Sequence, residues 1–209
     1  MKSRRFMLVL SFVLLISYTT MAFPLTITVG DNDGYGFGIP DNGTAPNPTW
    51  GYDGRSTAEA AATNGAQITD VYSAIFPGYG PNPSQTASVI FPLGGLHLTS
   101  ATLTVDMGDF EASTYGPISV NFNGVLQGWA FQDGYTYTVV RTFVLGPAEI
   151  AAANLAGAFI INLDHTGSMD FIAFDYFELN ADVAPLPGAV LLLGTGLLGL
   201  VGLRIKLKK

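Results

Sequence analysis

Between residues 23 and 182 the sequence contains no long stretch with the 3.6-residue period of an amphipathic helix. It contains many short runs rich in β-branched and aromatic residues, separated by Gly, Pro, Asn and Asp. This pattern is typical of an antiparallel sandwich or barrel. We therefore predict an all-β fold, an antiparallel β-sandwich, with strands at residues 25–29, 67–76, 87–91, 101–107, 118–122, 125–131, 135–145, 158–163 and 170–179.

Turn residues refine this prediction. Asn123-Gly124 lies between apolar runs, and both residues tolerate the positive φ of a type I′ hairpin turn. Asp133-Gly134 is a second hairpin-turn signal of the same kind, so the sequence predicts a three-stranded meander over residues 118–145.

Two short helices are expected beside the strands. Ser56 and Glu59 have the spacing of a capping box, and Pro147 opens an Ala-rich segment that Gly157 can end. Residues 31–54 are rich in Gly and Pro and are expected to be irregular.

The charge of the central segment limits its partners. Residues 23–182 hold all sixteen acidic residues of the chain and two arginines, a formal charge of −14, with no Lys. Such a surface repels nucleic acid and attracts divalent cations. The chain has no Cys, which excludes disulfides and thiolate metal sites.

The N-terminus has the organisation of a secretory signal peptide. Lys2, Arg4 and Arg5 precede an apolar run at residues 6–16, and Thr20-Met21-Ala22 offers a cleavage site. We predict a signal peptide over residues 1–22, cleaved after Ala22, and hence an exported protein. The alternative is an uncleaved anchor, for which the run is short.

The C-terminus carries a second apolar segment. Residues 189–203 are uncharged and are followed by Arg204, Lys206, Lys208 and Lys209. As a helix this run covers about 22 Å, less than the roughly 30 Å of a hydrocarbon core, so the span is marginal. We expect a transmembrane helix with a basic cytoplasmic tail over residues 189–209, after a linker at residues 181–188 that contains Pro185-Leu186-Pro187-Gly188.

This order of a Pro-x-Pro motif, a short apolar helix and a basic end resembles the PEP-CTERM sorting signal of Gram-negative bacteria. The last 26 residues are similar to its Val-Pro-Leu-Pro variants, with Leu186 where the founding motif has Glu. The resemblance implies sorting through Pro185, Leu186, Pro187, Gly188, Arg204 and Lys206. It also implies processing by an exosortase in bacteria that make exopolysaccharide. The expected location is the inner membrane before processing and the cell envelope or the outside afterwards.

A candidate metal site lies early in the central segment. Asp31, Asn32 and Asp33 place three oxygen-bearing side chains on a loop flanked by Gly30 and Gly34, which suits a hard cation such as Ca²⁺. It is not an EF-hand, because loop position 12 is Asn42. A solvated Asx turn is the alternative.

The central segment also resembles galactose-binding-domain-like jelly rolls. The resemblance rests on an Asn-Gly hairpin, a crossover helix and a last Asp-x-x-x-Leu strand within residues 102–179. It implies a jelly roll with a structural calcium ion between early loop residues and the last strand, which would recruit Asp175 or Glu178. The expected metal ligands are therefore Asp31, Asp33 and Asp175.

The sequence contains no clear catalytic motif. Asp106, Asp109 and Glu111 cluster in sequence, as a hydrolase carboxylate pair would, and an acidic loop at a sheet edge is the simpler interpretation. Aromatic residues in Gly/Pro-rich loops could stack on sugar rings: Tyr35, Phe37, Trp50, Tyr52, Tyr79, Tyr115 and Trp129. The leading hypothesis is a non-catalytic exported surface or matrix protein. The alternative is a calcium-assisted carbohydrate-binding module acting on exopolysaccharide.

Overall fold

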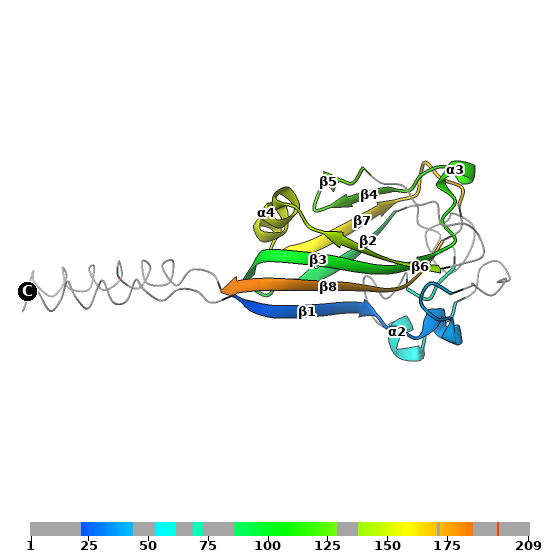
Figure 1. Cartoon of the computed structure of the whole chain (residues 1–209), viewed down its shortest axis with the longest axis horizontal. Coiled ribbons are helices and arrows are strands. Elements are labelled where there is room, and N and C mark those ends of the chain that lie inside the picture. The colour runs from blue at the N-terminus through cyan, green and yellow to red at the C-terminus, as the bar shows by residue number, and fades with distance from the viewer. Residues whose placement is uncertain are drawn as a thin grey trace, which may run out of the picture.

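The computed structural model describes residues 22–43, 53–61, 69–72, 86–128, 138–170 and 172–185, together with residue 196. They form two layered antiparallel sheets, as the sequence predicts (Figure 1). The strands are β1 (Phe23–Gly30), β2 (Thr86–Pro92), β3 (Leu96–Gly108), β4 (Ser119–Phe122), β5 (Val125–Leu126), β6 (Thr138–Val144), β7 (Ala158–Asp164) and β8 (Ala173–Pro185). The first sheet has the order β1-β8-β3-β6 and the second β2-β7-β4-β5.

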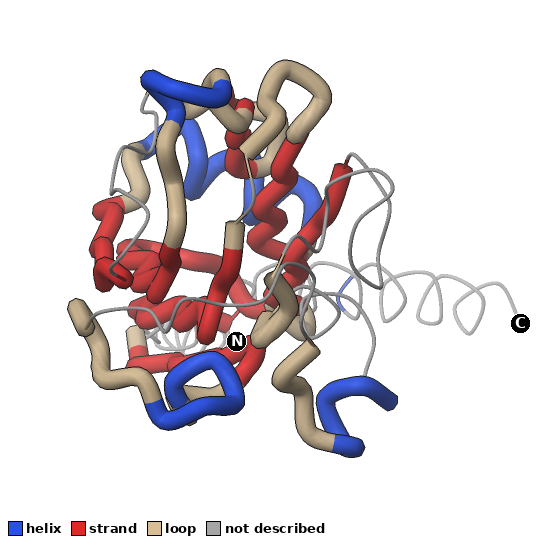
Figure 2. Tube along the Cα trace, turned by 90° about the vertical axis from the view of Figure 1, so that its right-hand side faces the viewer, coloured by secondary structure: helices blue, strands red, loops and turns tan. Residues whose placement is uncertain are grey.

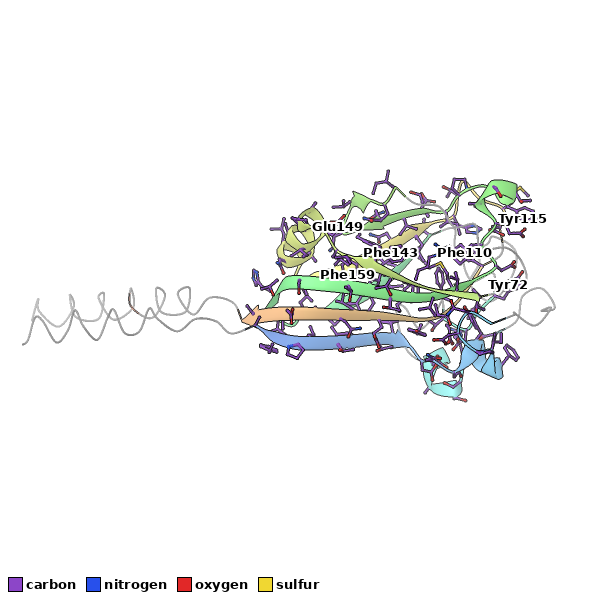
Figure 3. All side chains as sticks on the ribbon, viewed as in Figure 1. Tyr72, Phe110, Tyr115, Phe143, Glu149 and Phe159 are labelled. Atoms are coloured by element: carbon purple, nitrogen blue, oxygen red, sulfur yellow. The ribbon has the colours of Figure 1, made fainter. Side chains whose placement is uncertain are left out.

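The core lies between the sheets, because the apolar residues of strands such as β2, β4 and β7 alternate between a buried and a more exposed face. In β7 every second residue is buried, beginning with Phe159, as expected for a strand with one face on the core. Phe159 packs between Phe91 of β2 and Phe122 of β4, with ring centroids 5.7 and 5.3 Å away. Figure 3 labels Phe110, Phe143 and Phe159, three aromatic residues of this layer.

The Asn-Gly hairpin is present, but the predicted meander is wrong. Asn123 and Gly124 have φ of 50° and 85° and join β4 to β5. β5 ends at Leu126, and β6 pairs with β3 in the opposite sheet. The chain therefore crosses between the layers after β5, which local turn chemistry does not reveal.

Both expected helices are present. In α2 (Thr57–Ala61) the Ser56 amide donates to Glu59 Oε2 at 2.9 Å, and the Glu59 amide donates to Ser56 Oγ at 3.3 Å, which completes the capping box. In α4 (Pro147–Ala156) Pro147 occupies the first turn, and Gly157 ends the helix with φ of 69°. A third helix, α3 (Ala112–Tyr115), was not predicted.

The last strand is longer than expected. β8 continues to Pro185, and Ala181, Asp182 and Val183 pair with β1 and β3. The first residues of the expected linker at 181–188 therefore belong to the sheet, because ladder partners exist on both sides. No helix in the described ranges is long and apolar enough to span a membrane. The expected signal peptide and transmembrane helix lie outside the described residues, apart from Ala22 and Gly196.

One end of the sandwich carries most of the polar loops, and we call it the loop end. It contains the wide turn η1 (Gly34–Gly38), α2 and α3, whereas α4 and the end of β8 lie at the opposite end (Figure 1). Figure 2 views the molecule from the loop end. Residues 31–43 hydrogen-bond to β8 and β3 there, so carboxyl groups of these strands are covered by loop.

Candidate metal centre

A β-bulge places two acidic residues under the loop. Val105 pairs with Phe177, but Met107 pairs with Phe174, so β8 has one extra residue in this interval. Phe174 and Phe177 can therefore both enter the core, where their ring centroids are 4.7 Å apart. The bulge frees Asp175 from the core face and leaves it near Asp106 of β3, and both side chains are fully buried.

Residues 34 and 35 close over this pair. The amides of Gly34 and Tyr35 donate to the two carboxyl oxygens of Asp175, at 3.2 and 2.8 Å. The Tyr35 hydroxyl donates to Asp106 Oδ1 at 3.0 Å. Tyr35 has a φ of 61°, which is uncommon for a residue other than Gly, and only 1% of its surface is exposed. The loop is thus anchored on two neighbouring strands through carboxylates.

Two glycines allow the close approach of the loop segments. Gly30 has a φ of 79°, and a Cβ there would meet the Thr69 side chain at 2.7 Å. Gly36 has a φ of 74°, and a Cβ there would collide with the backbone carbonyl of Gly54. These contacts bring residues 31–36 against residues 53–54 and 69.

The approach gathers a first group of carboxyl groups. One oxygen from each of Asp31, Asp33, Glu59 and Asp70 lies within 4.8 Å of the others. Asp33 also caps the η1 turn, where its Oδ1 accepts from the Gly36 amide at 2.6 Å. Three segments of the chain, far apart in sequence, therefore contribute ligand-type oxygens to one small volume.

Asp70 is the least satisfied member of this group. Its exposed fraction is 0%, and neither carboxyl oxygen has a hydrogen-bond partner among the described residues. The backbone fixes its position, because its amide donates to Phe174 and its carbonyl accepts from Gly54, both at 2.7 Å. Burial, and then the neighbouring carboxyl groups of Glu59, Asp175 and Asp33, raise the pKa of Asp70 to about 10.

The pKa values of Asp31 and Glu59 are also shifted by the neighbouring carboxyl groups. Partial burial and the proximity of Glu59, Asp33 and Asp175 raise the pKa of Asp31 to about 6. Burial opposes ionisation of Glu59, but hydrogen bonds from Ser56 and the proximity of the carboxyl groups of Asp70 and Asp31 outweigh it and lower the pKa of Glu59. Without a cation this group retains protons to limit repulsion, and a divalent cation can replace them.

The basic side chain near this group, Arg55, forms an ion pair with Asp53. Arg55 Nε and Nη2 donate to the two oxygens of Asp53, at 2.8 and 2.7 Å. In the part of the chain that the structure describes this is the one ion pair. The Asp53 hydrogen bond, followed by the charges of Asp53, Glu59 and Asp70, raises the pKa of Arg55. Arg55 therefore offsets only part of the negative charge.

A second group lies beside the first. Asp41, Asp106 and Asp175 each place one oxygen within 4.8 Å of the others. Burial, with the charges of Asp175 and Asp41, raises the pKa of Asp106 to about 7 despite the Tyr35 hydrogen bond. Burial also raises the pKa of Asp175.

The structure thus divides the ligands expected from the sequence between two groups. Asp31 and Asp33 belong to the first group, and Asp175 belongs to the second. Sequence reasoning missed Glu59 and Asp70. Glu59 was assigned only to the capping box, which uses one of its oxygens, and Asp70 lies within a segment predicted to be a strand.

The acidic residues considered for hydrolysis enter different networks. Asp106 binds Tyr35, whereas Asp109 Oδ2 accepts from the Tyr72 hydroxyl, and the Glu111 amide donates to Asp170 at 2.6 Å. Burial, with the charges of Asp170 and Glu111, raises the pKa of Asp109 to about 7 despite Tyr72. His165 is fully buried near these residues, and burial lowers its pKa.

The aromatic residues considered for sugar stacking differ in their exposure to solvent. The Tyr35 side chain is buried, and its hydroxyl donates to Asp106, so its ring cannot stack on a sugar. Phe37 and Tyr115 are exposed, at 56% and 46% of their surfaces. Trp50, Tyr52, Tyr79 and Trp129 lie outside the described residues.

Comparisons with known proteins leave the function open. No family model matches the chain, and no curated protein matches its sequence. Among solved structures, dimeric latent PorU from Porphyromonas gingivalis is similar over 78% of this chain, with 11% identity and a TM-score of 0.39. The chain spans 13% of that protein. A likeness at this level carries no argument about function.

Proposed function

We propose that this chain is an exported, non-catalytic protein of the cell surface or extracellular matrix, whose loop end is held together by a calcium ion. The strand order β1-β8-β3-β6 and β2-β7-β4-β5 supports the finer assignment of the sandwich as jelly-roll-like. The proposed ligands are Asp31, Asp33, Glu59 and Asp70.

A single observation carries the calcium role: Asp70 is fully buried, its two oxygens have no hydrogen-bond partner among the described residues, and three further carboxyl groups converge on it. Buried carboxylates are expected to be paired or to coordinate a metal, because desolvation of an unpaired charge is costly. An all-oxygen set of carboxylates suits Ca²⁺, which accepts six to eight oxygen ligands in flexible geometry.

A calcium site of low affinity is compatible with an exported protein. Extracellular calcium modules work with dissociation constants of about 10⁻⁴ to 10⁻³ M, so an exported site needs no high affinity. The basic and apolar start of the chain supports export through a signal peptide over residues 1–22. The Pro-Leu-Pro motif and the apolar, basic C-terminus support sorting by an exosortase-type enzyme, with membrane association before processing.

Thermal unfolding of the full-length chain in detergent tests the calcium role. For a dissociation constant of about 1 mM, 10 mM Ca²⁺ should stabilise the protein by roughly 1.4 kcal/mol relative to EDTA. Asp70→Asn should show a smaller calcium stabilisation than wild type and should be at least as stable as wild type in EDTA, because it removes a carboxyl group that burial and its neighbours disfavour. Asp182→Asn is the matched control, since Asp182 is exposed and lies about 23 Å along β8 from Asp175.

An equal calcium effect in wild type and Asp70→Asn would contradict the assigned site. The sorting proposal is tested separately by mass spectrometry of the mature C-terminus from wild-type and exosortase-deficient cells. A shortened C-terminus only in the wild type supports it. The same C-terminus in both strains contradicts it.

A calcium-assisted carbohydrate-binding module is a second candidate, and the exposure of Phe37 favours it. Phe37 lies in η1, four residues after Asp33, and 56% of its surface is exposed, so calcium would hold an aromatic side chain at the surface where it can contact a sugar ring. Binding to host exopolysaccharide that requires Ca²⁺ and is lost in Phe37→Ala, but not in Leu155→Ala, would support this function. Leu155 is a control because it is also an exposed apolar residue, on α4.

A further inference from the structure

A calcium ion at the first group of carboxyl residues would not account for the second group, which consists of Asp41, Asp106 and Asp175. Asp41, Asp106 and Asp175 come from the turn after η1, from β3 and from β8. Their three convergent oxygens lie within 4.8 Å of one another, as the ligands of one metal ion do. None of the three belongs to the first group, so an ion there leaves their mutual repulsion in place.

Asp106 supplies an independent indication of a ligand. Its exposed fraction is 0%, its Oδ1 accepts from the Tyr35 hydroxyl, and its Oδ2 is buried with no partner among the described residues. A buried carboxyl oxygen without a donor costs free energy unless a proton or a cation satisfies it. The buried Oδ2 therefore requires something that the described side chains do not supply.

Asp175 and Asp41 retain capacity for a metal. Each oxygen of Asp175 accepts one amide hydrogen, from Tyr35 or from Gly34, and a carboxylate oxygen has two acceptor positions. Asp41 is exposed, and within the described part of the chain its Oδ2 accepts one long hydrogen bond, of 3.4 Å, from Asn32. An exposed ligand on a turn would let the ion exchange with solvent and keep water ligands.

From this arrangement we infer that the loop end binds a second divalent cation, through Asp41, Asp106 and Asp175, next to the calcium site of the proposed function. Asp175 joins the two positions, because it lies close enough to Asp70 and Asp33 for their charges to interact. Three carboxylates completed by water suit Ca²⁺ or Mg²⁺. The second ion would tie the 31–43 loop to the bulge between β3 and β8.

Calcium titration calorimetry of the full-length chain in detergent tests this inference. We expect two Ca²⁺ ions per chain in wild type, one in Asp106→Asn and one in Asp41→Asn. Asp41→Asn guards against a folding defect, because the Asp41 side chain is exposed. Asp70→Asn should also bind one ion, and the control Asp182→Asn should bind two.

The possible results separate this inference from the proposed function. One ion in wild type, lost in Asp70→Asn but kept in Asp106→Asn and Asp41→Asn, overturns the second position and retains the first. One ion lost in Asp106→Asn and Asp41→Asn but kept in Asp70→Asn supports the position inferred here and overturns the calcium site proposed above. One ion lost in all three variants means a single shared centre and overturns the inference. No binding in wild type overturns both.

Discussion

The hydroxyl of Tyr35 donates to Oδ1 of Asp106 at 3.0 Å, so a loop residue with φ of 61° is tied to the end of an interior strand by a buried carboxylate. The same residue donates its amide to Asp175 on the next strand. Tyr35 therefore couples the conformation of the 31–43 loop to the bulge between β3 and β8.

Replacing Tyr35 by Phe should destabilise the protein while keeping the ring. The change removes the hydroxyl that donates to Asp106, and loss of such a buried hydrogen bond costs about 1–3 kcal/mol. Urea unfolding in EDTA should show a lower midpoint with an unchanged slope. Tyr115→Phe is the control, because Tyr115 is exposed, and its midpoint should move little.

Asp109→Asn should change the pH dependence of stability. Burial raises the pKa of Asp109 to about 7, so its contribution to folding is fully present below about pH 4 and is lost as pH rises through about 7. Asn cannot lose a proton, yet its side-chain oxygen can still accept from Tyr72. The variant should therefore match wild type near pH 4 and gain stability relative to it by pH 8, by roughly 4 kcal/mol at most.

The measurement is the denaturation midpoint in EDTA at several pH values for both proteins. His165, whose pKa is lowered, acts in the opposite direction and destabilises the fold as pH falls below 6.5, but it is present in both. The difference between the two curves therefore isolates Asp109. A constant difference between pH 4 and pH 8 would contradict the prediction.

Asn154→Ala should weaken the attachment of α4 to the sheet and destabilise the protein. The Asn154 side chain accepts from the Leu98 amide at 2.7 Å and donates to the Leu98 carbonyl at 2.9 Å, as a ladder partner would. Loss of both bonds should cost about 2–3 kcal/mol in chemical denaturation. Leu155→Ala, at the neighbouring and 91% exposed position, should stay within about 0.5 kcal/mol of wild type.

Gly36→Ala should weaken calcium binding more than Gly38→Ala. Both glycines have a positive φ, 74° and 69°, so the backbone strain is similar. A Cβ at Gly36 would collide with the carbonyl of Gly54, whereas a Cβ at Gly38 meets nothing within 4 Å. Gly36→Ala should push Asp33 away from the segment that carries Glu59, and calcium titration should show about a tenfold loss of affinity for it alone.

The strands were predictable where the signal was local. β2, β4 and β7 follow the alternation of apolar residues, and Asn123-Gly124 and the Ser56–Glu59 capping box fix their turn and helix through adjacent residues. The assignment of β6 to the sheet of β3 was not predictable in this way. It depends on which sheet edge β6 joins, and β6 pairs with β3, which is distant from it in sequence.

The metal centre was only partly predictable. Asp31 and Asp33 stand out in sequence because Gly30 and Gly34 flank them, and the expectation for Asp175 came from a resemblance. Asp70 joins Asp31 through the packing of Gly30 on Thr69 and of Asp70 on Phe174. Asp106 and Asp175 meet because of a bulge. Neither contact leaves a periodic signal in the sequence.

β8 has hydrogen-bonded neighbours on both sides, β1 and β3, and the chain continues from its end at Pro185. A pull on the chain beyond Pro185, with the loop end held, would load both ladders along their length. Many hydrogen bonds would then have to break together, whereas a strand peeled from an edge loses them one at a time. The attachment of the C-terminal segment to an interior strand is therefore expected to make this domain resistant to mechanical extraction.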